Sequence, residues 1–246
     1  MLLEKKKVLI TGAGRGIGRQ TAIEMAKEGA VILGAGRTRE TLDSMAELVR
    51  NAGGEAYTAV MDIADYKESE QAIHFLAEKA GGIDILVNCA AVFEEAFFLD
   101  MTPEQWQRTV SIDLTGAYNV THIAIPFILK SKGSVIHIVS QDAFYGCTGY
   151  SHYSACKAGV VGLVRTLARE LGPEGVRVNC VAPGITETDM TRDRIETGLQ
   201  GYLDKLPVGR IGQPEDIANS VVFLASEKSD FITGQVIHCN GGMYLG

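Results

Sequence analysis

The 246-residue chain is 46% apolar and 22% charged, which supplies a sizeable core and excludes disordered, collagenous and low-complexity classes. Its 30 acidic and 23 basic side chains give a net charge of −7. This balance disfavours nucleic acid or an anionic membrane as the main partner, because phosphate binding depends on cationic surface. No apolar run approaches the ~20 residues that a helix needs to span a bilayer.

Two local features favour a cytoplasmic location. The chain starts with a very short apolar stretch followed by Glu4 and three lysines, with neither the apolar region nor the cleavage site of a signal peptide. The cysteines are odd in number, scattered and without a C-x-x-C pair, at positions 89, 147, 156, 180 and 239. We therefore expect reduced, mostly buried thiols, and neither a disulfide framework nor a metal site.

Short β-branched runs alternate with helical stretches along the chain. They predict strands at residues 8–11, 30–33, 56–60, 85–88, 135–139, 176–181 and 235–239. Helices are expected at residues 16–28, 39–51, 66–79, 103–129, 153–171 and from 214 onward, whereas residues 184–213 form an irregular excursion. Regular alternation predicts an α/β fold with a mostly parallel seven-stranded sheet and helices on both faces, in a single doubly wound domain spanning residues 1–246.

The helix that starts after Thr102 has the clearest start signal. Thr102 is an N-cap, Pro103 occupies the first helical position and Gln105 completes a capping box. The apolar pattern then continues to about Leu129, and we expect Pro126 to kink the last turn.

In a doubly wound sheet, ligands bind outside the carboxyl ends of the strands, so these ends are the place to search for a site. The first strand is followed by the pattern T-G-x-x-x-G-x-G from Thr11 onward. Glycines let backbone amides approach a pyrophosphate, which the N-terminus of the following helix also attracts. We therefore expect a nucleotide at Gly12, Gly14, Arg15, Gly16, Ile17 and Gly18, although an ordinary strand-to-helix turn can also be rich in glycine.

The end of the second strand bears on which dinucleotide binds. Enzymes that use NAD usually place an acid here for the ribose hydroxyls, but this chain has Arg37 and Thr38. Arg37, flanked by Arg15, offers a cationic fork for a 2′-phosphate. The alternative is a plain surface arginine. The sequence favours NADP(H).

The next two strand ends add weaker signals. Asp62, followed by Ile63, is suited to hydrogen-bond an adenine amino group. Asn88 and Ala90 belong to a segment of small residues that lets a cofactor sugar lie against the backbone. Each could be a plain turn, but their position at successive strand ends supports a cofactor site.

The residues for chemistry come later in the chain. Tyr153 and Lys157 share one face of a helix at i and i+4, thirteen residues after Ser140 ends the fifth strand. An ammonium beside a phenol favours the phenolate and lowers the tyrosine pKa from its ordinary ~10. Such a phenol exchanges a proton with a carbonyl or alcohol oxygen, which Ser140 can also hydrogen-bond. A tyrosine and a lysine at this spacing are also common on ordinary amphipathic helices.

Taken together, these residues resemble the short-chain dehydrogenase/reductase family over essentially the whole chain, and the resemblance implies a Rossmann fold. Residues 182–191 and 210–244 look most like bacterial 3-oxoacyl-[acyl-carrier-protein] reductases. By this resemblance Tyr153 is the general acid/base, Lys157 binds the nicotinamide ribose and Ser140 orients the substrate oxygen. The resemblance also implies nicotinamide contacts at Pro183, Gly184, Thr186 and Thr188. Residues beyond 190 would cover the substrate, and two long helices would form one interface of a homotetramer.

Two departures from the family pattern stand out. The family's catalytic asparagine falls on Asp113, whose carboxylate can accept hydrogen bonds but cannot donate them while ionised. Its charge near Lys157 would partly cancel the effect of the ammonium on Tyr153. The second departure is the segment N-C-A-A after Val87 in place of N-N-A-G, where only backbone and small side chains are needed.

Three functions stay open at this point. The first is NADPH-dependent reduction of a 3-oxoacyl thioester or similar ketone, with an acyl carrier protein as a candidate partner. Lys130 and Lys132 could steer that acidic partner, whereas Glu174 opposes it. The second is a dehydrogenase of a small secondary alcohol, sugar or polyol. The third is a nucleotide-binding protein with weak catalysis, which the aspartate at position 113 motivates.

Overall fold

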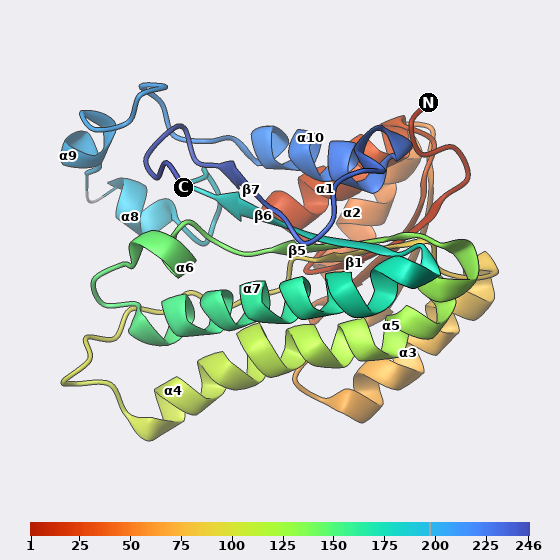
Figure 1. Ribbon diagram of the computed structural model, residues 1–246, viewed down its shortest axis with the longest axis horizontal. Coiled ribbons are helices and arrows are strands. Elements are labelled where there is room, and N and C mark those ends of the chain that lie inside the picture. Colours follow the sequence, from red (N-terminus) through yellow and green to blue (C-terminus); the bar gives the residue numbers. More distant parts are fainter. Residues whose placement is uncertain (197) are drawn as a thin grey trace.

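The structure is a computed structural model that describes residues 1–196 and 198–246. Seven parallel strands form one sheet in the order β3-β2-β1-β4-β5-β6-β7, so the prediction of a mostly parallel seven-stranded sheet is confirmed (Figure 1). The strands are β1 (Lys7–Thr11), β2 (Val31–Gly36), β3 (Glu55–Val60), β4 (Ile85–Asn88), β5 (Ser134–Ile138), β6 (Arg177–Pro183) and β7 (Val236–Cys239).

Helices cover both faces of this sheet, as the alternating pattern predicted. One face carries α1 (Gly16–Lys27), α2 (Arg39–Asn51) and α10 (Pro214–Ala225), and the other carries α3 (Tyr66–Ala80), α5 (Ala117–Ser131) and α7 (Ser151–Leu171) (Figure 1). Each face encloses its own apolar cluster, and the two clusters share the strands between them. Burial on both faces explains why the strands are near-continuous apolar runs.

The stretch predicted as one helix over 103–129 is divided in the structure. Thr102 and Gln105 form the expected capping box, and α4 (Pro103–Thr109) follows it. The chain then winds as a π-helix, η1 (Val110–Gly116), before α5 continues through Pro126. The main departure from α-helical geometry therefore lies around Asp113, at a wider turn of the kind that often occurs at functional sites.

The topology fixes where a ligand can bind. Strand order reverses between β1 and β4, and the crevice outside their carboxyl ends is the switch point of a doubly wound sheet. Three short helices lie at this end: α6 (Asp142–Tyr145), α8 (Arg192–Glu196) and α9 (Gln200–Leu203) (Figure 1). The latter two belong to the excursion predicted at 184–213, within which Thr197 lies outside the described residues.

Short 3-10 turns complete the chain, η2 (Gly172–Glu174) after α7 and η3 (Glu227–Ser229) after α10. Among the described residues, no helix combines the length and apolar character that crossing a membrane requires.

Candidate active site

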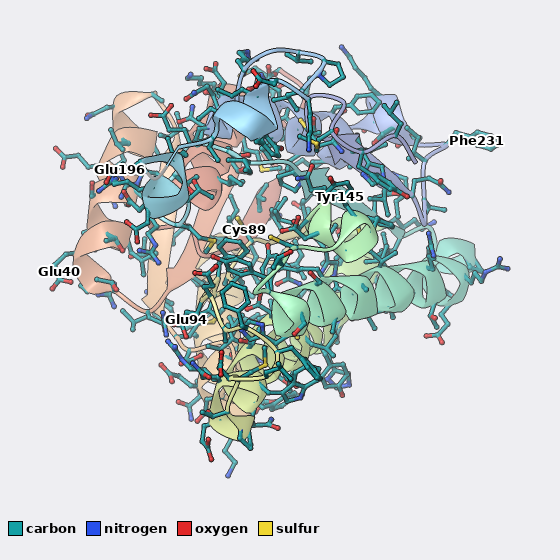
Figure 2. All side chains as sticks on the ribbon, turned by 90° about the vertical axis from the view of Figure 1, so that its left-hand side faces the viewer. Glu40, Cys89, Glu94, Tyr145, Glu196 and Phe231 are labelled. Carbon is teal, nitrogen blue, oxygen red and sulfur yellow. The ribbon has the colours of Figure 1, made fainter. Side chains whose placement is uncertain are left out.

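A cavity of about 380 Å³ lies at the carboxyl ends of the strands. Figure 2 views the molecule from this end, with the lining residue Cys89 near the middle. The lining includes these predicted residues: Gly12, Gly14, Arg15, Gly16, Ile17, Gly18, Arg37, Thr38, Asp62, Ile63, Ala90, Ser140, Tyr153, Lys157, Pro183, Gly184, Thr186 and Thr188. Of the predicted site residues, all of which the structure describes, only Asn88 and Asp113 lie outside the lining.

The loop between β1 and α1 fits an anionic group. Helix α1 has neither a side-chain cap nor an acidic residue in its first turn, which leaves its N-terminal N–H groups available to a ligand. Gly12 and Gly16 have φ angles of +67° and +53°. A Cβ at Gly12 would lie 2.9 Å from the Cα of Ala90, so the close approach of the two loops requires glycine. The loop therefore fits the pyrophosphate of a dinucleotide.

The ends of β2 and β3 line the adenosine side of this cavity. Arg15, Arg37 and Thr38 have exposed side chains there. Asp62 follows β3, and its Oδ1 accepts the backbone N–H of Ala64 at 2.9 Å, which orients the carboxylate. No acid from the end of β2 is among the described lining residues. The arrangement fits a ribose that bears a 2′-phosphate.

Asn88 has a different position from the one expected of a residue that contacts the cofactor. It is buried, and its Nδ2 donates to Thr121 Oγ1 at 2.9 Å. Thr11 Oγ1 donates to Asn88 Oδ1 at 3.4 Å and accepts the N–H groups of Cys89 and Ala90 at 3.1 and 3.2 Å. Asn88 thus holds the loop after β4 in place from behind, while the neighbouring small residues line the cavity.

Ser140 and Tyr153 are in contact at the far end of the cavity. Ser140 Oγ accepts the backbone N–H of Asp142 at 3.1 Å, and the serine hydroxyl also hydrogen-bonds the Tyr153 phenol. Because the Asp142 N–H occupies a lone pair, the serine O–H is left to donate to the phenol or to a substrate oxygen. The two hydroxyls define where a reacting oxygen would be held.

Lys157 lies one helical turn after Tyr153, as the i, i+4 spacing predicted. Its Nζ is 5.4 Å from the centroid of the tyrosine ring and donates to the Ile138 carbonyl at 3.3 Å. It also forms a buried ion pair with Asp113, with 3.6 Å between Nζ and Oδ2. The other oxygen of Asp113 accepts the N–H of Val92 at 2.8 Å. Asp113 therefore connects the loop after β4 to the lysine.

Burial is the largest cause of the pKa shifts of Asp113 and Tyr153. Burial raises the pKa of Asp113, against the Lys157 charge and the Val92 N–H, which lower it. The pKa of Tyr153 lies well above its ordinary value, mainly because of burial and then because of the charges of Asp113 and Asp142, while Ser140 opposes the shift. The prediction that Lys157 holds this pKa below 10 is wrong for this structure. A phenol with a raised pKa keeps its proton at neutral pH, and a general acid must carry its proton before it can donate it.

Sequence reasoning missed three side chains that line the cavity next to Tyr153. Phe93 stacks on Tyr150, with 4.0 Å between ring centroids and 8° between planes, and its ring meets that of Tyr153 edge-on at 4.8 Å. Gln141 and Asp142 follow Ser140 directly. A polar pair immediately after a strand-end serine was a usable signal, whereas nothing local in the sequence marks Phe93.

A nucleotide cradle beside a buried tyrosine, lysine and serine at the switch point of a doubly wound sheet defines the class of nicotinamide-dependent oxidoreductases. A family model described as enoyl-(acyl carrier protein) reductase matches residues 12–244. The 3-oxoacyl-[acyl-carrier-protein] reductase FabG of Thermotoga maritima is 37% identical over 246 residues, covering 100% of both chains. The FabG of Aquifex aeolicus is 39% identical over 244 residues, covering 98% of both.

Solved structures agree with these relatives. A crystal structure from Brucella melitensis, described as a short-chain dehydrogenase/reductase (glucose/ribitol dehydrogenase), has a TM-score of 0.94 and 34% identity over 100% of this chain and 99% of that chain. The chain therefore belongs to the short-chain dehydrogenase/reductase family and is an oxidoreductase, as the sequence predicted.

Proposed function

We propose that this enzyme reduces a ketone to a secondary alcohol with NADPH, with Tyr153 as the proton donor. The observation that carries the proposal is that Ser140, Tyr153 and Lys157 line the same cavity as the glycine-rich loop. Arg15 and Arg37 at the other end of the cavity support NADPH over NADH, because an arginine fork suits a phosphate.

Each residue of the site has a separate role in the proposed reduction. NADPH, when bound in this cavity, would supply the hydride that the carbonyl carbon accepts. Ser140 donates a hydrogen bond to the carbonyl oxygen and holds it beside Tyr153, which transfers its phenolic proton to that oxygen as the alcohol forms. Lys157, fixed by Asp113 and the Ile138 carbonyl, places a positive charge beside the phenolate that remains. We propose Asp113 as the residue that positions this lysine.

A 3-oxoacyl thioester is the first substrate class, because the curated relatives are named for it. An acyl carrier protein is then the candidate partner, which Lys130 and Lys132 support and the nearby Glu174 opposes. A small hydroxylated ketone, or in reverse a polyol, is the second class, because Gln141 and Asp142 place hydrogen-bond acceptors in the cavity.

The family resemblance supports a homotetramer in the cytoplasm. Trp106 on α4 and Tyr118 on α5 are large and 40% and 47% exposed, which fits an interface along these helices. No disulfide joins the five cysteines, all of which lie in the described ranges, and this fits a reducing compartment. Sedimentation of the purified protein tests the assembly, and a mass of one 26.4 kDa chain would contradict it.

Consumption of NADPH tests the reaction itself. The enzyme is mixed with NADPH and, in turn, an acetoacetyl thioester, small ketones and hydroxyketones, and in reverse with NADP and polyols. Turnover of at least one carbonyl that is faster with NADPH than with NADH supports the proposal. Tight NADPH binding without turnover of any of these compounds would contradict it and would favour a nucleotide-binding protein with weak catalysis.

A further inference from the structure

Two hydrogen-bond acceptors lie beside the reacting centre without a role in the mechanism above. Gln141 and Asp142 are only 5% and 9% exposed, and both line the cavity directly after Ser140. Gln141 Nε2 donates to the Tyr202 hydroxyl of α9 at 3.4 Å. This contact turns the amide so that its Oε1 is buried and has no hydrogen-bond partner among the residues that the structure describes. A buried acceptor in this situation favours a ligand that brings a donor.

Asp142 lies next to this amide and close to the catalytic tyrosine. Its backbone N–H is tied to Ser140 Oγ at 3.1 Å, which fixes the start of α6 against the serine. Asp142 and Tyr153 line the same cavity, and the charge of Asp142 is one of the causes that raise the pKa of Tyr153. Gln141 and Asp142 together form an acceptor subsite, one residue and two residues beyond the serine that holds the substrate oxygen.

The rest of the lining limits what this subsite can hold. Among the described residues that line the cavity, the cations are Arg15, Arg37 and Lys157. Arg15 lies in the glycine-rich loop, Arg37 lies where the 2′-phosphate is expected, and Lys157 lies beside Tyr153. A substrate carboxylate or phosphate beside the reacting carbon would therefore meet Asp142 without a compensating cation. Phe93, held flat against Tyr150, offers an apolar wall for a carbon skeleton.

We propose that Gln141 and Asp142 bind a hydroxyl group on a carbon next to the reacting carbonyl. The substrate class is then a small uncharged hydroxyketone and, in reverse, its vicinal diol. This inference rests on the proposed ketone reduction and selects between its two substrate classes. A 3-oxoacyl thioester has no O–H or N–H group on the carbons that flank its ketone, so it would leave the buried Oε1 of Gln141 without a donor.

A matched set of ketones tests the subsite. The probes are 3-hydroxy-2-butanone, 3-methoxy-2-butanone, which keeps the oxygen but lacks the donor, and an acetoacetyl thioester. With NADPH in excess, we expect kcat/KM for the hydroxyketone to exceed that of the methoxyketone and that of the thioester by about 10-fold or more, since a site built to bind a hydroxyl rejects an analogue without it.

Variants assign the preference to the two residues. Gln141→Leu and Asp142→Ala, singly and together, should bring the hydroxy-to-methoxy ratio toward 1, whereas Gln141→Glu keeps an acceptor oxygen and should keep the preference. Asp189→Asn is the matched control, because Asp189 also lines the cavity but pairs with Arg192. It should leave the ratio unchanged.

The outcomes separate the subsite from the reaction. Turnover of the methoxyketone or the thioester at a rate equal to that of the hydroxyketone would overturn the subsite and leave the proposed ketone reduction intact. An undiminished ratio in the double variant would also overturn it. If NADPH reduces none of the probes, the proposed reaction fails and the substrate class falls with it.

Discussion

Asp113 is one of the two positions at which the sequence departs from the expected family pattern. Its carboxylate is fully buried, and it contacts Lys157 and the Val92 N–H rather than the cavity. An asparagine at this position would make similar hydrogen bonds without the charge. The charge of Asp113 acts through space on Tyr153, whose pKa it helps to raise.

Replacing Asp113 with asparagine should therefore shift the pH dependence of reduction. Reduction needs the protonated phenol, so its rate falls as pH rises through the Tyr153 pKa. Asp113→Asn removes one cause of the raised pKa, and the alkaline limb should move to lower pH. A shift of about one pH unit corresponds to about 1.4 kcal/mol. The pH profile of kcat/KM measures this, with the exposed Asp43→Asn on α2 as control. Identical profiles for wild type and Asp113→Asn would refute the coupling.

Cofactor choice is the second prediction at the scale of single residues. We expect NADPH to bind more tightly than NADH and Arg37→Asp to reverse the preference, because the change replaces a phosphate partner with an acid. Loss of one charge-assisted contact worth ~1.5–3 kcal/mol corresponds to roughly 10- to 100-fold in affinity. Fluorescence titration gives both dissociation constants. Arg39→Asp, two residues away and outside the lining, should keep the NADPH preference. Equal affinities in the wild type would contradict this assignment.

At the scale of elements, sequence patterns predicted almost every strand of the sheet and almost every helix that covers it, because these segments bury regular apolar faces. The π-helical turn at 110–116 could not be predicted, since the apolar pattern that starts after Thr102 continues through it without a break. The inward position of Asn88 could not be predicted either. The sequence places Asn88 at a strand end, but only the fold shows that its side chain hydrogen-bonds with Thr11 and Thr121.

The contact between the glycine-rich loop and α1 gives a prediction at this scale. A Cβ at Gly18 would lie 2.3 Å from the Gly12 carbonyl oxygen, so Gly18→Ala must push α1 away from the loop. We expect a lower melting temperature and weaker NADPH binding. Gly162→Ala in α7 is the matched control, because a Cβ there meets nothing within 4 Å. It should be neutral or stabilise the protein by up to about 1 kcal/mol. Equal melting temperatures for the two variants would show that the contact is unimportant.

At the scale of the whole molecule, the sheet brings residues from distant parts of the chain together at the carboxyl ends of its strands. Gly12, Asp62 and Ser140 each follow a different parallel strand, and they meet because parallel strands end at the same side. This rule made most of the cavity lining predictable from strand ends alone. The direction of the Tyr153 pKa was not predictable, because it depends on burial and on Asp142, which the sequence does not bring near the phenol.

A ligand that binds across the carboxyl ends of the strands should stabilise the whole fold. NADPH at 100 times its dissociation constant should add about 2.7 kcal/mol to the free energy of unfolding. For a chain of this length that is about 5–10 °C in melting temperature. Thermal unfolding with NADPH and with NADH at equal concentration measures the difference, and we expect the larger shift with NADPH. An unchanged melting temperature with saturating NADPH would be inconsistent with a cofactor that binds this cavity of the folded protein.

The most direct test of the central claim is Tyr153→Phe, measured for turnover and for NADPH affinity in the same preparation. The substitution removes only the phenolic oxygen and its proton, so turnover of the best ketone should fall to background while NADPH affinity stays within a few-fold of wild type. Lys157→Ala should impair both, because we propose that the ammonium also binds the nicotinamide ribose. Appreciable turnover by Tyr153→Phe would contradict the assignment of this phenol as the proton donor.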